Sequence, residues 1–398
     1  MRNSNSRGFE IELSSFMRLR LLFIFIFGSI LSGLGMKMEA ETISTTAWTK
    51  LVPSTGLPSE IAIQKGNNNL DVSYFKGRYY FAFRTAPSHF ASPKAHLYVL
   101  SSPDRKNWQL EKQICLGADL REPRFLAMDS ALYFYFFEAG KSPFSFAPEH
   151  IWGCHLGANG KFSEIQNLQW DGYVPWRMRR HGDQMYMSVY WGRNLYNGKH
   201  NGEVRLLKSE NGYDWKPISP EPQTGNKGGE EAEFIFDREG NLWGTIRLEG
   251  AGAQVVFADK DSLDKWQTFP TRDKYDSALL FSHKDNIYLI SRRNLDGPSE
   301  RGGLLPPKLQ RNYNLIRYSL TRKCTALWKL DKQKKKLIHL VDFPSTGDTA
   351  FPAITEFTAG RFWLLNYSSD IEGPQKNWIR GQLGKTYIYE TILEIGAQ

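Results

Sequence analysis

Apolar and polar residues alternate with a period of two along much of the chain, and short polar turns interrupt the alternation. Six segments share one form: an apolar strand, a tight turn with Gly, Asp or Asn, and a second strand rich in aromatic residues. They are residues 69–84, 122–137, 175–190, 231–247, 276–292 and 351–367. Alternation around such turns is typical of β-hairpins rather than helices. The pattern therefore predicts six β-hairpins.

The hairpins recur at intervals that are typical of the blades of a β-propeller. Counted from residues 68, 122, 174, 231, 276 and 351, successive starts lie 54, 52, 57, 45 and 75 residues apart. Repeats of about 40–50 residues with several strands each indicate propeller blades. We therefore predict an all-β, six-bladed β-propeller. The longest interval contains an insertion, residues 294–312, which we expect to be functional or mobile.

The last blade needs a strand from elsewhere in the chain. After its hairpin, residues 385–395 offer one more strand before the C-terminus. A stretch near the N-terminus, Thr46–Val52, can supply the fourth strand and close the ring, which removes exposed sheet edges. We therefore expect a single domain that spans residues 45–398.

Residues 1–40 have the features of a secretion signal. Arg18 and Arg20 precede an apolar run of 14 residues, Leu21–Leu34, which is shorter than the roughly 20 residues of a membrane span. The polar stretch before this run is unusual for a signal and points to Met17 as the true start. We predict export to the periplasm or outside the cell, with no stable membrane insertion once the signal is removed.

Composition narrows the classes of partner. Among 398 residues, 41% are hydrophobic and 14% aromatic, which suffices for a large core. The net charge of +9 is moderate and Lys334–Lys336 is the one dense basic run, so we expect no nucleic-acid partner.

Cys115, Cys154 and Cys324 lack CxxC spacing, which argues against a disulfide framework or a zinc site and favours core positions. We expect no metal, no cofactor and a monomer.

Charged residues recur at the strand ends that would meet around a central channel. Each copy pairs the residue that opens its first strand with the residue 16 positions further on. The pairs are Asn68/Arg84, Glu122/Glu138, Val174/Tyr190, Glu231/Arg247, Asp276/Arg292 and Phe351/Tyr367. The innermost strands of a propeller line its channel, so we expect these charges at the channel mouth. Further polar residues should join them there, namely Asp71, Asp119, Arg121, Arg177 and Asp348.

Two interpretations of this polar ring remain open. The charges could form structural salt bridges that hold the blades together, with an arginine beside each carboxylate. They could instead hydrolyse a glycosidic bond, in which one carboxyl protonates the leaving oxygen and another group acts as nucleophile or base. Crowded carboxylates push their pKa values apart, which separates these two roles. Clustered arginines would bind the carboxylate of an acidic sugar.

We predict a glycoside hydrolase that acts on a complex glycan, with a non-catalytic carbohydrate-binding propeller as the alternative and a scaffold for protein partners as a third class. The leading catalytic candidates are Glu231, which Arg247 can orient, and Asp71, whose neighbours Asn67–Asn69 can bond a sugar hydroxyl. Glu122 and Asp348 follow. The residues expected to bind and orient the carbohydrate are Arg84, Arg121, Arg177, Arg247 and Arg292, together with the aromatic residues Trp176, Tyr190 and Tyr367.

A second element repeats with the form S-x-[DN]-x-x-[ND]-W. It occurs at residues 102–108 and 209–215, with a degenerate copy at 261–266. The Asp or Asn can accept hydrogen bonds from neighbouring amides, and the Trp can pack between blades. We interpret these segments as structural turns without a chemical role.

The fourth copy resembles the sialidase-like six-bladed propellers. In that family a Glu is followed by a Gly nine residues later and an Arg sixteen residues later, here Glu231, Gly240 and Arg247. The resemblance implies that the Glu assists a tyrosine nucleophile and that the Arg belongs to a triad that binds the sialate carboxylate. Arg292 or Arg311 would be a second member of that triad. The S-x-[DN] turns resemble the Asp boxes of the family.

Two positions differ from the sialidase pattern. The nucleophilic Tyr of the family falls at Phe351, which has no hydroxyl, and its first Arg falls near Asn67. Other motifs resemble an uncharacterised bacterial subgroup of sialidase-like proteins and extend over most of the mature chain. They are Phe83-Arg84, Asp119–Pro123, Trp176-Arg177, Glu230-Glu231, Pro344–Thr349 and Tyr367–Gly373. This resemblance implies the fold and leaves the substrate open.

Overall fold

The computed structural model describes residues 41–142, 146–193, 202–225, 228–303 and 305–397. Residues 43–395 form one compact unit. The predicted signal, residues 1–40, lies outside the described residues. Neither of the helices described below is long and apolar enough to cross a membrane.

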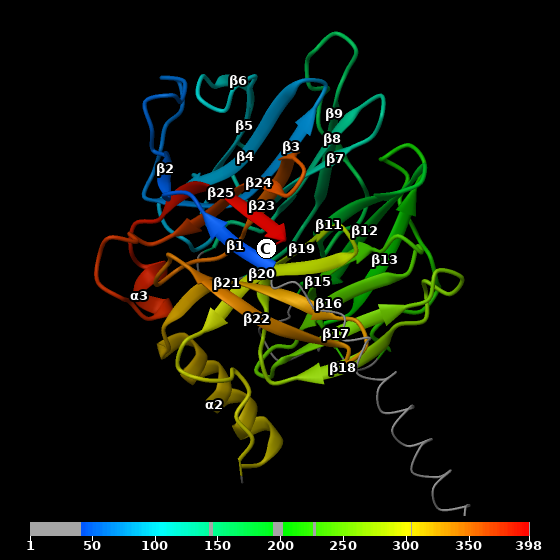
Figure 1. Cartoon of the computed structure of the whole chain (residues 1–398). Helices are drawn as coiled ribbons and strands as arrows, with labels where there is room; N and C mark the ends of the chain where they lie inside the picture. The colour runs from blue at the N-terminus through cyan, green and yellow to red at the C-terminus, as the bar shows by residue number, and fades with distance from the viewer. Residues whose placement is uncertain (1–40, 143–145, 194–201, 226–227, 304, 398) are drawn as a thin grey trace, which may run out of the picture. The chain divides into compact units, whose positions relative to one another are not determined.

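The unit at residues 43–395 consists of antiparallel sheets arranged as the six blades of a β-propeller (Figure 1). The first blade contains β3 (Gly66–Phe75), β4 (Arg78–Ala86), β5 (His96–Ser102) and β6 (Gln109–Ile114). The second contains β7 (Leu120–Ala127), β8 (Leu132–Glu138), β9 (Ile151–Leu156) and β10 (Gln166–Asn167). The third contains β11 (Tyr173–His181), β12 (Gln184–Trp191), β13 (Val204–Ser209) and β14 (Lys216–Pro217). The fourth contains β15 (Glu230–Phe236), β16 (Leu242–Arg247), β17 (Ala253–Ala258) and β18 (Gln267–Thr271). The fifth contains β19 (Asp276–His283), β20 (Asn286–Asn294), β21 (Lys323–Asp331) and β22 (Lys336–Phe343). The six predicted hairpins and the all-β propeller are confirmed.

Strands from both ends of the chain form the sixth blade. Its sheet contains β23 (Ala353–Thr358), β24 (Arg361–Ser368), β25 (Tyr387–Ala397), β1 (Glu41–Thr45) and β2 (Thr49–Val52). β2 pairs with β25, with Thr49 opposite Glu390 and Val52 opposite Ile388. The first strands of neighbouring blades contact one another, and β23 contacts β3 of the first blade. The predicted closure of the ring by an N-terminal strand is confirmed.

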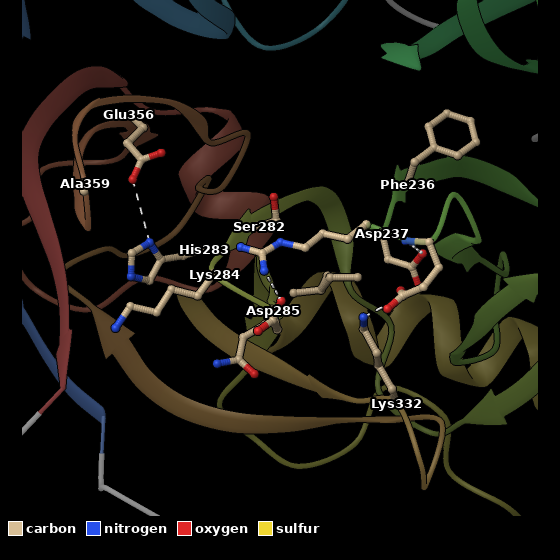
Figure 2. Close-up of a pocket in the computed structure, with 13 residues that line it drawn as sticks. Phe236, Asp237, Ser282, His283, Lys284, Asp285, Lys332, Glu356 and Ala359 are labelled. Carbon is tan, nitrogen blue, oxygen red and sulfur yellow. Dashed lines mark hydrogen bonds and ion pairs between the residues drawn. The ribbon is translucent and has the colours of Figure 1, made fainter. Parts of the chain in front are cut away.

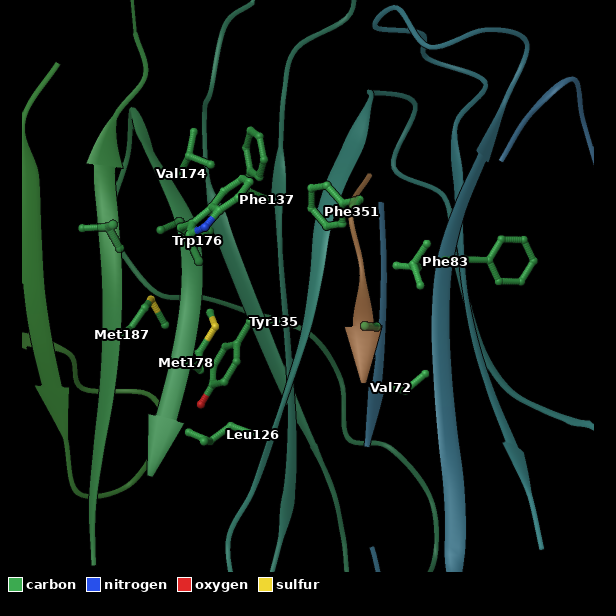
Figure 3. Packing of buried hydrophobic residues seen from close by; sticks show 14 of the residues in the cluster. Val72, Phe83, Leu126, Tyr135, Phe137, Val174, Trp176, Met178, Met187 and Phe351 are labelled. Atoms are coloured by element: carbon green, nitrogen blue, oxygen red, sulfur yellow. The ribbon is translucent and has the colours of Figure 1, made fainter. Parts of the chain in front are cut away.

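Apolar side chains fill the spaces between blades. Figure 3 shows this packing around Tyr135 and Leu126 of the second blade and Met178 of the third, all of which are buried. Cys154 and Cys324 are buried as expected. Cys115 is exposed, because it follows the end of an outer strand, so its expected core position is wrong. All three thiols are free.

The repeated S-x-[DN] turns have the predicted structural role. In the first, the Asp104 carboxylate accepts hydrogen bonds from the amides of Lys106 and Asn107, both at 2.9 Å. The Trp108 ring stacks on Trp363 of the sixth blade, with ring centroids 5.9 Å apart. These turns therefore stabilise their own backbone and the contact between blades.

The insertion in the fifth blade contains a helix that the sequence pattern did not predict. This helix, α2 (Pro307–Leu320), begins with proline in its first turn, which is a favourable position. Its large apolar residues are mostly exposed, and its buried residues are Asn314 and Tyr318. The helix was missed because a pattern search expects the apolar side to be the buried side. A second short helix, α3 (Trp378–Gln382), lies in the sixth blade next to α2.

Each blade carries a one-residue bulge near the start of its innermost strand. The register between the two inner strands shifts by one residue in each blade. In the first five blades the shift lies within residues 68–70, 121–124, 175–177, 230–233 and 276–279, and in the sixth it lies between residues 349 and 353. Two of the expected pairs differ in the structure: Glu138 faces Leu120, and Arg247 faces Glu230 because of the bulge. A bulge bends the strand and redirects the side chain of the extra residue. The six bulges therefore determine which side chains reach the channel mouth.

Candidate active site

A cavity of about 320 Å³ opens at the bulged ends of the innermost strands. The bulges supply five of its lining residues, and each has a left-handed backbone with φ between 42° and 122°. These residues are Asn69, Glu122, Glu231, Ser277 and Phe351. Left-handed conformations are uncommon for residues other than glycine and are often found at functional sites. Five blades thus direct one side chain each into a single cavity.

Glu122 is a buried carboxyl group that is 7% exposed. Its Oε1 accepts a hydrogen bond from Asn69 Nδ2 at 3.1 Å, and its Oε2 lies 3.1 Å from Arg124 Nη2. Burial raises the pKa of Glu122 to about 8; the Arg124 charge opposes this shift, and the Glu231 charge adds to it. Glu122 therefore keeps its proton at neutral pH and can act as a general acid.

Glu231 lies in the same cavity with both carboxylate oxygens in contact with donors. Arg247 Nη1 donates to Oε1, and the Ser277 amide donates to Oε2 at 2.8 Å. The contact with Ser277 joins the fourth blade to the fifth. These two donors fix the orientation of the Glu231 carboxylate.

Arg247 is shared among four carboxyl groups. Besides Glu231, its guanidinium lies 3.2 Å from Glu230, 2.8 Å from Glu249 and 3.2 Å from Asp276. Burial raises the pKa of Glu230 well above its ordinary value, although the Arg247 charge opposes the shift. Arg247 thus joins the four carboxyl groups, and two further cations share the cluster, since Lys274 lies 3.4 Å from Glu249 and Arg292 lies 3.5 Å from Asp276.

Arg292 lies in the cavity wall beside the aromatic groups of the two helices. Its Nη1 lies 3.3 Å from the Tyr318 hydroxyl of α2, and its guanidinium lies 5.4 Å from the centre of the Trp378 ring of α3. The Tyr318 hydroxyl also donates to the Asp276 carboxylate. Sequence analysis missed Tyr318 and Trp378 because both lie in insertions outside the repeated hairpins.

A third group of residues connects His89 to the sixth blade. His89 Nδ1 lies 2.7 Å from one oxygen of the buried Asp348, and the Tyr367 hydroxyl donates to the other at 3.0 Å. Burial alone would raise the pKa of Asp348, but the His89 and Arg292 charges hold it below its ordinary value. His89, Arg121 and Tyr367 line the cavity, whereas Asp348 lies behind them. The irregular loop after β4 carries His89, and no sequence pattern marked it.

The structure brings several of the sequence-predicted residues together at the cavity. They are Glu122, Glu231, Arg121, Arg247, Arg292, Tyr190 and Tyr367. Other predicted residues lie in the packed layer outside it. These are Asp71, which accepts from the Phe125 amide at 2.8 Å; Arg84, which pairs with Asp119; Arg177, which pairs with Glu233; Trp176, which contacts Phe351 edge to face; and Arg311 on α2. The expected ring therefore has two layers, an inner lining and a set of buried pairs that supports it.

No protein-family model matches the chain, and no curated protein matches it. Solved structures do match. A protein of unknown function from Dyadobacter fermentans superposes with a TM-score of 0.61 at 14% identity, over 89% of this chain and 99% of the other. Trypanosoma rangeli sialidase gives 0.59 at 12% identity, over 89% of this chain and 60% of the other, which is less than two thirds of that enzyme. Phage phi92 endosialidase gives 0.57 at 12% identity, over 88% of this chain and 69% of the other. The chain therefore has the fold of the sialidase-like six-bladed propellers.

Proposed function

We propose that the protein is a glycoside hydrolase in which Glu122 is the general acid and Glu231 is the nucleophile or base. The observation that supports this proposal is one cavity lined by a carboxyl group with a pKa of about 8 and by a second carboxylate held by Arg247 and an amide. Hydrolysis of a glycosidic bond needs such a pair, with one member protonated and the other ionised.

The two carboxyl groups differ because their partners differ. The Glu122 carboxyl group contacts Arg124 and Asn69, and its burial outweighs the nearby positive charge, whereas Glu231 contacts the Arg247 guanidinium and the Ser277 amide. Phe351 occupies the position at which sialidases would carry a tyrosine, so a carboxylate has to take the role of nucleophile or base. Asp71 and Asp348 lie behind the cavity wall, and we give them supporting roles.

The substrate we propose is a complex glycan with an acidic sugar. Three arginines, Arg121, Arg247 and Arg292, line the cavity, and guanidinium groups bind carboxylates through paired hydrogen bonds. Tyr190 and Tyr367 line the same cavity and offer ring faces to a sugar. The apolar segment within residues 1–40 supports export to the periplasm or outside the cell, where such glycans are accessible.

A carbohydrate-binding protein without catalysis is the second candidate. Both Glu231 oxygens are engaged by donors of the protein itself, and Phe351 lacks the hydroxyl of a tyrosine nucleophile. A protein of this kind would use the same cavity to bind a glycan without cleaving it.

The experiment is a screen of the purified protein against a panel of glycans, with released sugar and binding both measured. On a cleaved substrate, Glu231→Gln and Glu122→Gln should each lower kcat by about 10²- to 10⁴-fold, because general acid–base groups contribute that much. Asp285→Asn is the control, because Asp285 is exposed at the opposite end of the blades. Binding without release of sugar would favour the second candidate, and full activity of both variants would contradict the proposed roles.

A further inference from the structure

A separate cluster of metal-binding side chains lies where β8 and β9 approach each other. Glu138 is the last residue of β8, and Glu149 and His150 immediately precede β9. The Glu138 amide donates to the His150 carbonyl at 3.0 Å, and the Glu149 amide donates to the Glu138 carbonyl at 2.8 Å. These backbone bonds continue the pairing of Phe137 with Ile151, so Glu138 and His150 are cross-strand neighbours.

The side chains of this cluster are close enough to share one ion. One ligand atom from each of Glu138, Glu149 and His150 lies within 4.8 Å of the others. Glu138 is only 9% exposed, and among the described residues its carboxylate has no hydrogen-bond or ion-pair partner. Since no described cation or donor contacts this carboxylate, its oxygens are available to bind an ion. The buried carboxylates of the mouth, such as Glu122 and Asp276, contact an arginine, whereas Glu138 faces a second carboxylate and an imidazole.

The imidazole also has a carboxylate partner, as many metal-binding histidines do. His150 Nδ1 lies 2.8 Å from Asp171 Oδ1. When Nδ1–H donates to this carboxylate, the lone pair of Nε2 is left to bind a cation. Metal-binding histidines commonly have such a carboxylate partner, which fixes the tautomer and the direction of the ring.

We propose that Glu138, Glu149 and His150 bind one divalent transition-metal ion of the Zn²⁺ class, with Asp171 as the positioning residue of His150. Two carboxylates and one imidazole match the ligand types that Zn²⁺ accepts, and three protein ligands leave a position for water. An ion at this site would link the two ends of the connection between β8 and β9. Phe146 belongs to this connection and lines the cavity at the channel mouth. The three residues follow no known spacing motif, so the sequence alone did not predict this site.

The test is calorimetric titration of the chelator-treated full chain with Zn²⁺, in a Cys115→Ser background because that exposed thiol could also bind zinc. We expect one saturable site per chain, at least 100-fold weaker binding in Glu138→Gln, and about 10- to 100-fold weaker binding in Asp171→Asn. Zinc should also raise the melting temperature of the parent chain, by mass action, but not that of Glu138→Gln.

The chain offers a matched control. His339 and Asp342 form a similar exposed pair, with His339 Nε2 2.7 Å from Asp342 Oδ1. His339→Ala should therefore leave zinc binding unchanged. If Glu138→Gln does not fold, His150→Ala, at a partly exposed side chain, should show the same loss. Absence of stoichiometric binding, or equal affinity in the parent and in the Glu138 or His150 variant, would overturn the proposal.

Discussion

The two ends of the blades both carry acidic and basic side chains, but in different environments. At the bulged end, the Arg247 and Glu231 side chains are 12% and 11% exposed. At the opposite end, where hairpin turns connect the inner strands, the paired Arg238 and Asp285 side chains are 68% and 78% exposed. The cavity at this turn end is the larger of the two, at about 530 Å³ (Figure 2).

This difference shows why neither charge nor cavity size identifies the site. In Figure 2 the ion pairs bridge neighbouring turns, with Glu356 near His283 and Lys332 near Asp237. The exposed Arg238–Asp285 pair of this end contributes about 0–1 kcal/mol, because water screens it. At the mouth, burial removes that screening and raises the pKa of Glu122 to about 8, on which the proposed role of Glu122 as general acid depends.

The largest effect should come from removing the central guanidinium of the mouth. Arg247→Met removes the cation that Glu230 and Glu231 contact, so we expect the free energy of unfolding to fall by about 3–5 kcal/mol. Arg238→Met at the turn end should change it by less than about 0.5 kcal/mol. Denaturant unfolding of both variants checks this comparison. Similar losses in the two variants would show that the ends do not differ as described.

A smaller loss of stability should follow removal of the Tyr318 hydroxyl, which α2 contributes to the layer behind the cavity. Tyr318→Phe removes the donor to Asp276 and the contact with Arg292, so we expect a loss of about 1–3 kcal/mol. Tyr313→Phe is the matched control on the same helix, because the Tyr313 side chain is 47% exposed. Thermal unfolding of the two variants measures the difference. A neutral Tyr318→Phe would mean that the helix does not support the mouth.

The third effect is a slope with pH rather than a loss at one pH, and it concerns the dependence of stability on the protonation of Glu122. The pKa of Glu122 rises from an ordinary value of 4.5 to about 8 on folding, so the folded state binds more protons between these pH values. Stability should therefore fall as pH rises from about 4.5 to 8, with a contribution of at most about 1.4 kcal/mol per pH unit from this group. Glu122→Gln should lack this contribution. An identical pH dependence in the parent and the variant would contradict the shifted pKa.

The repeat predicted the fold well because each blade obeys local rules. Alternating apolar residues around a turn define a hairpin without knowledge of the other blades, and the spacing of the hairpins predicts their number. Closure by β2 followed from the missing strand of the last blade. Helix α2 was not predicted, because it buries Tyr318 and Asn314 and exposes its apolar side.

The site was harder to predict than the fold, for two physical reasons. The bulges shift the pairing by one residue, so a fixed offset of 16 paired Arg247 with Glu231 and missed Glu230 as its cross-strand neighbour. Place relative to the bulge also separates residues that look alike in sequence: Glu122 lies in a bulge and lines the cavity, whereas Asp71 follows the bulge of its strand and lies in the layer behind the cavity. His89 and Tyr318 come from irregular segments, where no repeat pattern applies.

The central claim is that Glu122 holds the catalytic proton at the mouth. Its most direct test is the pH dependence of kcat/KM on a substrate found in the glycan screen, measured for the parent protein and for Glu122→Gln. The account predicts a parent activity that falls on the alkaline side with an apparent pKa of about 8, and a variant that has lost most activity together with that alkaline limb. Parent-like activity with the same alkaline limb in Glu122→Gln would contradict it.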